Sequence, residues 1–195
     1  RWGEQEDPNQ FPLVSMAMLM SLRGSVCLYQ GEELGLPEAD VPFEALQDPY
    51  GIEFWPEYKG RDGCRTPMVW DNSEHAGFST TKPWLPVDPM HLERSVETQE
   101  QQNDSTLHKM RQFIQWRQQQ PALIQGEMEL VEETGEAFLF KRQSDEQSLL
   151  VAINMTGKEL TVPYSGAIKA VLIGHGFSGR YEHGAIVLPP YQALF

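Results

Sequence analysis

Apolar residues recur every three to four positions near the start of the chain, and this spacing predicts a helix over residues 9–23. Leu13, Met16 and Met20 mark its broad apolar face. Gly24 follows at once and is a natural stop, because glycine readily takes the left-handed conformation that ends helices. The segment is therefore expected to bury one side against the rest of the protein.

A second helix is predicted from Asp104 or Ser105, either of which can cap it, to about Gln118. Pro121 closes the periodic segment. The apolar stripe of this helix comprises Leu107, Met110, Phe113 and Ile114.

The short apolar run 25–29 follows the first helix directly and has flanking glycines. Such a run is typical of a fully buried parallel strand. Cys27 lies within it and is expected to pack there as a small hydrophobic residue. A helix followed by a buried strand indicates an α/β arrangement.

Residues 30–103 contain no long periodic segment and are rich in proline, glycine and aromatic residues. Short helical turns are predicted near 42–46 and 91–96. About 70 irregular residues in succession are unusual in a compact domain and indicate functional loops.

After Pro121 the pattern changes to short alternating runs, which predicts an antiparallel β-sandwich with a boundary near residue 120. Turn-forming pairs separate the runs, as at Thr134–Gly135. Leu149, Val151 and Ile153 should share one sheet face, and their strand should be central because nearly all of its residues are apolar. The predicted strands are 127–130, 137–141, 149–154, 159–163, 168–173, 185–188 and 193–195.

The composition excludes some classes of function. A net charge of −13, with few and scattered Lys and Arg, argues against nucleic acid but is compatible with a neutral ligand. No apolar run reaches the length of a membrane span, so no membrane partner is predicted. The five histidines are isolated and the two cysteines, Cys27 and Cys64, are too few for a disulfide scaffold. Neither a metal nor a cofactor is predicted.

The segment 60–71 concentrates Gly60, Arg61, Asp62, Arg65 and Trp70 in one short stretch. Its glycines and a proline favour an ordered loop over a helix or strand. A rigid fork of guanidinium donors beside an aromatic face suits a neutral polyhydroxyl ligand. An Arg–Asp pair that only pins the loop fits the same residues, so spacing alone leaves both interpretations open.

This segment resembles the "RD-x-x-RTPM-x-W" run of glycoside hydrolase family 13, in the α-glucosidase and oligo-1,6-glucosidase branch of the α-amylase family. Residues 24–35 are similar to the family's segment at the eighth barrel strand, with Val26 where the pattern often has proline. Residues 76–79 and 82–87 give a third match in the expected order.

The resemblance implies the fold. Residues 1–120 would be the last helices, the eighth strand and a long βα loop of an incomplete (β/α)8 TIM barrel, and residues 121–195 a C-terminal antiparallel β-sandwich. The chain would then be the C-terminal part of a longer protein, partnered by the N-terminal barrel half.

The resemblance also implies where the chemistry lies. Family members use a retaining mechanism, and their carboxylates follow the fourth, fifth and seventh strands, which would precede Arg1. No catalytic residue is therefore expected in this chain, and these 195 residues alone should not hydrolyse a glycoside. The adjacent Glu32 and Glu33 are unsuitable, because neighbouring residues cannot readily converge on one anomeric carbon.

Arg61 matches the family arginine that reaches the glucose at the non-reducing end, and it is the expected substrate contact. Phe54 and Trp55 are candidates for a wall on the aglycone side. Supporting roles are expected for Asp62, which should orient the loop, and for Arg65, which should pair with a carboxylate. Glu33 is expected to accept from buried donors, and Tyr29 and Trp70 are expected to be core residues.

The function implied is that of a cytoplasmic, exo-acting α-glucosidase that acts on short α-glucosides or oligosaccharides. Trehalose-6-phosphate hydrolase, sucrose isomerase and transglucosylase activities use the same scaffold and stay open. A catalytically silent relative is a further alternative. A free-standing carbohydrate-binding module is disfavoured, because a parallel barrel strand needs neighbours on both sides.

Overall fold

The computed structural model describes residues 7–131 and 135–195, so Thr134 of one predicted turn lies outside the described residues. The described chain forms two compact units. One, here called the loop unit, comprises residues 29–108. The other, the sheet unit, comprises the described residues of 2–28 and 109–195. The boundary near residue 120, taken from periodicity, thus differs from the division by packing.

Both predicted helices form. Helix α1 covers Gln10–Ser21 and helix α5 covers Thr106–Arg117. The carboxylate of Asp7 starts α1 by accepting hydrogen bonds from the backbone N–H groups of Asn9 (2.9 Å) and Gln10 (2.8 Å). These hydrogen bonds hold the pKa of Asp7 below its usual value. The short helix α6, Pro121–Gln125, was not predicted. Pro121 begins it, because proline is favoured in the first turn of a helix.

Two antiparallel sheets form the rest of the sheet unit. The first has the strand order β1-β2-β3-β7 and the second has the order β4-β6-β5. The strands are β1 Glu127–Leu130, β2 Phe138–Gln143, β3 Ser148–Ile153, β4 Leu160–Pro163, β5 Arg180–Glu182, β6 Ala185–Leu188 and β7 Ala193–Leu194.

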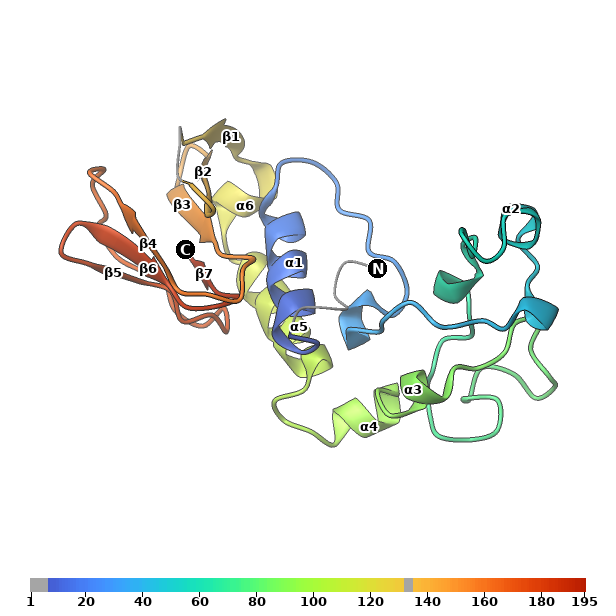
Figure 1. Ribbon diagram of the computed structural model, residues 1–195. Helices are drawn as coiled ribbons and strands as arrows, with labels where there is room; N and C mark the ends of the chain where they lie inside the picture. Colours follow the sequence, from blue (N-terminus) through green and yellow to red (C-terminus); the bar gives the residue numbers. More distant parts are fainter. Residues whose placement is uncertain (1–6, 132–134) are drawn as a thin grey trace. The chain divides into compact units, whose positions relative to one another are not determined.

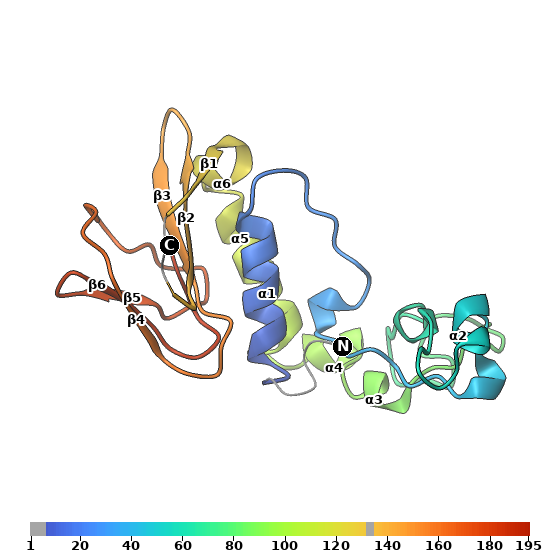
Figure 2. The same ribbon diagram turned by 45° about the horizontal axis from the view of Figure 1, so that its top comes forward.

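The first sheet is the middle layer of the sheet unit (Figure 1). Leu149, Val151 and Ile153 of β3 pack in one cluster with residues of α1, α5 and α6, while Ala152 packs in another cluster with Ile186 of the second sheet. Figure 2 shows the same order of helices, first sheet and second sheet from another direction. The prediction that β3 is a central strand is confirmed, and both of its faces are covered at Val151 and Ala152.

Two of the predicted strands do not form. Residues 25–29 form no strand, and all but the half-buried Val26 are exposed, Cys27 included. A parallel strand needs hydrogen-bonded neighbours on both sides, and the described chain supplies none here. Residues 168–173 also form no strand, although Leu172 N donates to Phe195 O (2.8 Å). Strand β5, by contrast, was not predicted.

The loop unit contains only short helical turns, as its irregular sequence predicts. The turns expected near 42–46 and 91–96 are present. Its elements are η1 Glu32–Leu34, η2 Phe43–Ala45, α2 Pro49–Glu53, η3 Asp62–Cys64, α3 Pro89–Leu92, α4 Val96–Glu100 and the first turn of α5. Leu34, Val69 and Leu107 share its larger apolar cluster.

Gln99 connects distant parts of the loop unit although it is buried. Its side-chain amide donates to Leu34 O (2.9 Å) and Arg94 O (3.1 Å), and its side-chain carbonyl accepts from Leu107 N (2.9 Å). Each partner is a backbone group that has no regular helix or strand to satisfy it. A satisfied buried amide therefore replaces the missing ladder of backbone hydrogen bonds.

Arg142 of β2 is the largest polar side chain of the buried interior, with 1% of its surface exposed. Its Nη1 donates to Ser21 O (2.6 Å) and Leu22 O (2.8 Å), where α1 ends. Its Nη2 donates to Gly126 O (2.9 Å), where α6 ends, and to Leu123 O (3.4 Å). Carbonyls at a helix C-terminus lack intrahelical donors and carry partial negative charge. One guanidinium therefore joins two helix ends to the first sheet.

Arg117 extends this arrangement from α5. Its Nε donates to Met20 O (2.6 Å) and its Nη2 to Leu123 O (3.1 Å). Burial lowers the pKa of both arginines, and for Arg142 the positive charge of Arg117 lowers it further. Both remain cationic, because the ordinary arginine pKa lies far above neutral pH.

His175 is a buried histidine held in its neutral form. Its Nε2 donates to Leu172 O (2.8 Å), and its Nδ1 accepts from Phe177 N (3.1 Å). The ring packs against Trp116 and Phe195. Burial lowers the pKa of His175, and the hydrogen bond to Leu172 opposes this only in part.

No helix among the described residues is both long and apolar enough to cross a membrane.

Replacing Arg142 by Met should destabilise the sheet unit by about 3–5 kcal/mol, because four carbonyls lose a buried, charged donor. Arg142→Lys should not restore the lost stability, since a single ammonium group cannot reach the carbonyls of two helix ends at once. Urea denaturation of the full-length protein measures the effect. Arg23→Ala is the matched control, because it breaks only the exposed pair with Glu127. Equal midpoints for Arg142→Met and Arg23→Ala would show that the guanidinium is dispensable.

Acid should weaken the sheet unit through His175. The unfolded state takes up a proton as the pH falls through about 6.5, whereas the folded state resists until its own, lower pKa. Stability is therefore full above about pH 6.5 and decreases below it. In His175→Gln the amide can make both hydrogen bonds without titrating, so its stability should change less between pH 7 and pH 5. Parallel pH profiles of the unfolding free energy for the two proteins would contradict this.

Candidate functional site

The segment 60–71 is an ordered loop, as predicted, and glycine is required at its start. Gly60 has φ +73°, and a Cβ there would come within 2.9 Å of the Asp48 side chain and 3.0 Å of Gly51. At Gly63 a Cβ would collide with the carbonyl oxygen of Ala39. The loop therefore lies directly on the segment that precedes it, with no room for side chains at these two positions.

Two aspartates fix this loop through backbone N–H groups. Asp62 is 1% exposed, and its Oδ2 accepts from Gln47 N (2.6 Å) and Asp48 N (2.7 Å). Asp48 in turn accepts from Arg61 N (2.9 Å) at Oδ2 and from Tyr50 N (3.0 Å) at Oδ1. Each carboxylate holds the backbone of the other's segment, so the two segments are ordered together.

The two arginines of the loop differ in their partners. The guanidinium of Arg65 lies 3.3 Å from Asp48 Oδ2 and 3.6 Å from Asp62 Oδ1. Arg65 thus contacts both of the carboxylates that accept backbone N–H groups in this loop. The Arg61 side chain is exposed and has no hydrogen bond or ion pair with any described residue. The backbone of Arg61 is therefore fixed, while its guanidinium is available to hydrogen-bond a ligand.

Asp48 was missed as a candidate from the sequence. The dipeptide Asp48–Pro49 is a helix-start pattern, and Asp48 is indeed the N-cap of α2. Burial alone would raise the pKa of Asp48, but the backbone donors of Arg61, Tyr50 and Gly51 and the charge of Arg65 outweigh it, so the pKa lies below its usual value. The carboxylate therefore stays ionised at mildly acidic pH.

The predicted core positions of Tyr29 and Trp70 are wrong for the described structure. Half of each residue is exposed, because no apolar element of the described chain covers them. Phe54 is exposed as well and stacks on Tyr50, with ring centroids 6.1 Å apart and planes at 8°. Trp55 is partly buried against Phe43, with centroids 5.6 Å apart. The loop unit thus presents several aromatic faces.

Glu32 and Glu33 serve the backbone at the start of the loop unit. Glu33 Oε2 accepts from Gly31 N (2.9 Å), and Glu32 Oε2 accepts from Tyr29 N (3.0 Å). Among the described residues, no group of three or more His, Cys, Asp or Glu side chains is placed to hold a metal ion.

The sequence matches known proteins over its whole length. The family model for the alpha amylase catalytic domain matches residues 1–126. The chain belongs to the alpha-amylase family. A "probable alpha-glucosidase" of Rhizobium meliloti (strain 1021) is 43% identical over 196 residues, which cover 100% of this chain and 36% of the relative. The oligo-1,6-glucosidase of Bacillus cereus is 30% identical and is matched over 91% of this chain and 36% of its own length.

Solved structures of the family agree with this fold. An alpha-glucosyl transfer enzyme, XgtA, is 40% identical and superposes with a TM-score of 0.93 over 98% of this chain and 36% of that one. Trehalulose synthase MutB of Pseudomonas mesoacidophila MX-45 shares the fold, with a TM-score of 0.83 at 22% identity. This match covers 99% of the present chain and 39% of the MutB chain. The chain therefore spans just over one third of the length of these relatives.

Asp48→Asn should loosen the loop around Arg61. An asparagine still offers one oxygen to Tyr50 N, but its amide NH2 would face the donors of Arg61 and Arg65. Amide hydrogen exchange of the peptide spanning 60–66 should become roughly tenfold faster or more, because a charged acceptor is lost. Asp88→Asn is the matched control: Asp88 caps α3 in the same way, before a proline, and the other hydrogen bond of its carboxylate comes from Asp40 N (3.2 Å), which lies outside the 60–71 loop. Equal exchange in the two variants would contradict the assignment.

Proposed function

We propose that the full-length protein is a retaining, exo-acting α-glucosidase that hydrolyses terminal α-glucosidic bonds of short oligosaccharides. The names of the relatives at 43% and 30% identity support the reaction class. In this proposal the present chain supplies one wall of the glucose pocket and the C-terminal sheets. The catalytic carboxylates belong to the part of the protein outside these residues.

Arg61 is the observation on which the proposal depends. Its backbone is held by Asp48, its neighbour Arg65 occupies both loop carboxylates, and its own guanidinium projects without a protein partner among the described residues. A planar fork of donors in a fixed position fits neighbouring hydroxyls of a sugar ring. The arrangement is the one expected of a residue that meets the terminal glucose.

The barrel context gives Arg61 its position. We infer that residues 25–29 are the eighth strand of a (β/α)8 barrel, and that 30–103 is the loop that follows it. Active sites in this fold are built from such loops at the C-terminal ends of the strands. Four of the five residues 25–29 are exposed, as expected for a barrel strand whose two neighbouring strands are absent. The β-sandwich beyond residue 120 then completes the proposed domain organisation.

Several proposed roles follow for the remaining residues. Asp48, Asp62 and Arg65 position Arg61, and Glu33 orders the backbone where the strand ends. Phe54 is exposed and fits an aglycone wall, to which the partly buried Trp55 adds support. No metal or cofactor enters this proposal. Two cysteines that form no disulfide, Cys27 and Cys64, fit a reducing cytoplasmic location.

Glucosyl transfer is a second candidate, favoured by the 40% identity to an alpha-glucosyl transfer enzyme. Both reactions share the covalent glycosyl-enzyme intermediate of a retaining mechanism. They differ in whether water or a sugar hydroxyl attacks it. Product analysis of the full-length protein with an α-glucoside and an added sugar acceptor separates the two, since transfer yields a new oligosaccharide and hydrolysis yields free glucose.

Arg61→Ala should lower kcat/KM of the full-length protein for p-nitrophenyl α-glucoside by roughly 10²-fold or more. A charged hydrogen bond at a water-excluded site is worth about 1.5–3 kcal/mol, and misplacement of the sugar adds to the loss. Arg61→Lys should recover little, because an ammonium cannot reproduce the planar fork.

Arg23→Ala is the control, since this exposed arginine pairs with Glu127 in the sheet unit. If a folded Arg61→Ala protein kept the wild-type kcat/KM, the proposal that Arg61 contacts the terminal glucose would be wrong. If the full-length wild-type protein released neither glucose nor p-nitrophenol from p-nitrophenyl α-glucoside, the hydrolase proposal itself would be wrong and a catalytically silent relative would be favoured.

A further inference from the structure

A groove of about 540 Å³ crosses the face of the first sheet that is turned away from α1, α5 and α6. It exists because the second sheet covers only part of this face. Leu139 and Ala152 are covered, whereas Lys141 and Ser148, further along the same strands, line the open part. The chain that leaves β4 at Pro163 forms the other wall.

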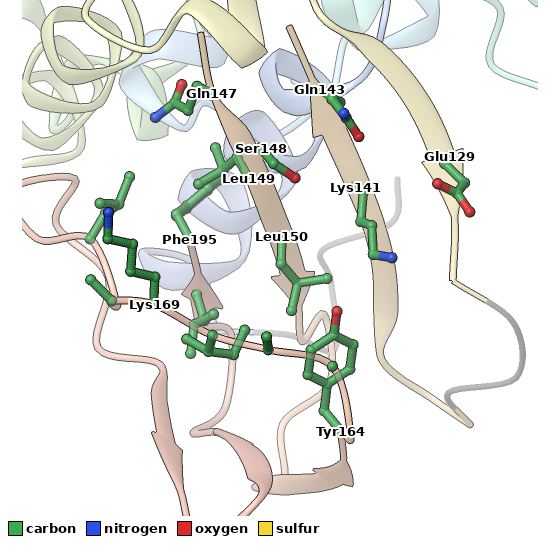
Figure 3. A pocket seen from close by; sticks show the side chains of 16 residues that line it. Glu129, Lys141, Gln143, Gln147, Ser148, Leu149, Leu150, Tyr164, Lys169 and Phe195 are labelled. Carbon is green, nitrogen blue, oxygen red and sulfur yellow. The ribbon is translucent and has the colours of Figure 1, made fainter. Parts of the chain in front are cut away.

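The floor of the groove carries both hydrogen-bond donors and acceptors. Glu129, Lys141 and Leu150 are partners in one row across β1, β2 and β3, and Gln143 is paired with Ser148 in the next row. Figure 3 shows these side chains on one side of the strands. In the described structure, no hydrogen bond or ion pair joins any of four polar side chains of the floor to another described residue. These side chains are Glu129, Lys141, Gln143 and Ser148.

Tyr164 supplies an aromatic group on the opposite wall. Its ring lies against Gly166, where an added Cβ would collide with it, and its hydroxyl is turned toward the strands (Figure 3). Its backbone carbonyl accepts from the Tyr181 hydroxyl (3.3 Å), which fixes this part of the wall. A half-buried ring held in this way is a rigid apolar surface with a polar end.

The chemistry of the lining selects a neutral polyhydroxyl ligand. Lys141 faces Glu129 directly across the strands, and Lys169 adds a positive charge on the opposite wall. Charges of both signs therefore line the groove, without the cluster of like charges that would favour an anion or a cation. Amide and hydroxyl groups offer donors and acceptors together, as paired sugar hydroxyls require. The Tyr164 ring and Leu150 suit the apolar face of a sugar ring.

The groove is elongated. A second hollow, also of about 540 Å³, runs over Glu127, Met128 and Ser144 and shares Glu129, Lys141 and Gln143 with the first. A single sugar ring would fill only part of this length. We propose that the groove binds a chain of several α-linked glucose units, a ligand class that rests on the proposed function.

Affinity electrophoresis of the full-length protein tests this inference. Native gels contain soluble dextran or soluble starch, polymers whose chain ends are scarce, and identical gels without glucan give the reference mobility. The wild-type protein should be retarded by at least one of the two glucans. Tyr164→Ala and Lys141→Ala should each weaken the apparent affinity roughly tenfold, through a lost ring contact or a lost charged donor.

Gln143→Ala provides a variant whose fold is safe, because this side chain is exposed at the end of β2. Phe138→Ala is the matched control: it removes an exposed aromatic from the same strand outside the groove lining and should leave the retardation unchanged. No retardation of the wild type by either glucan, or equal retardation of the groove variants and the control, would overturn the proposal.

The same preparations separate this inference from the proposed function. Retardation that depends on Lys141 and Tyr164 supports the groove even where no glucose is released from p-nitrophenyl α-glucoside. If the protein releases glucose but neither glucan alters its mobility, the α-glucosidase proposal stands and the proposal that the groove binds glucan is wrong.

Discussion

The fold of the sheet unit depends on one buried cation. Arg142 stands on the central sheet and reaches the ends of α1 and α6, where carbonyl groups have no helical donor. In a chain with a net charge of −13, the hydrogen bonds of this cation go to backbone carbonyls and not to carboxylates. Apolar packing alone would hold the helix layer against the sheet without fixing where each helix ends, and the guanidinium sets that position.

The loop unit uses the same principle with the opposite charge. Asp48 and Asp62 accept backbone N–H groups of segments that have no helix or strand long enough to satisfy them. Because these two carboxylates also engage Arg65, the hydrogen bonds and ion pairs that order the loop do not require the Arg61 guanidinium. The order of the loop and the availability of Arg61 therefore have one cause.

Sequence reasoning succeeded where structure is set by local pattern and failed where it depends on distant partners. Helices α1 and α5 and strand β3 follow from periodicity, and the ordered loop at 60–71 follows from its glycines and proline. The run 25–29 has the composition of a buried strand but no neighbours here, so its pattern could not become structure. Arg142 was invisible as an anchor, because a lone arginine in a strand does not reveal which carbonyls it will meet. Asp48 was recognisable in principle from the Asp-Pro pair, but its contact with Arg61 bridges two segments.

The different groups that hold the two units imply different responses to acid. The sheet unit contains His175, whose lowered pKa makes protonation costly in the folded state once the pH falls below about 6.5. Arg142 and Arg117 do not titrate in this range. In the loop unit the pKa of Asp48 lies below that of an ordinary carboxyl, so its hydrogen bonds persist to lower pH. Mild acid therefore acts first on the packing around Trp116 and Phe195, while the loop that positions Arg61 keeps its hydrogen bonds.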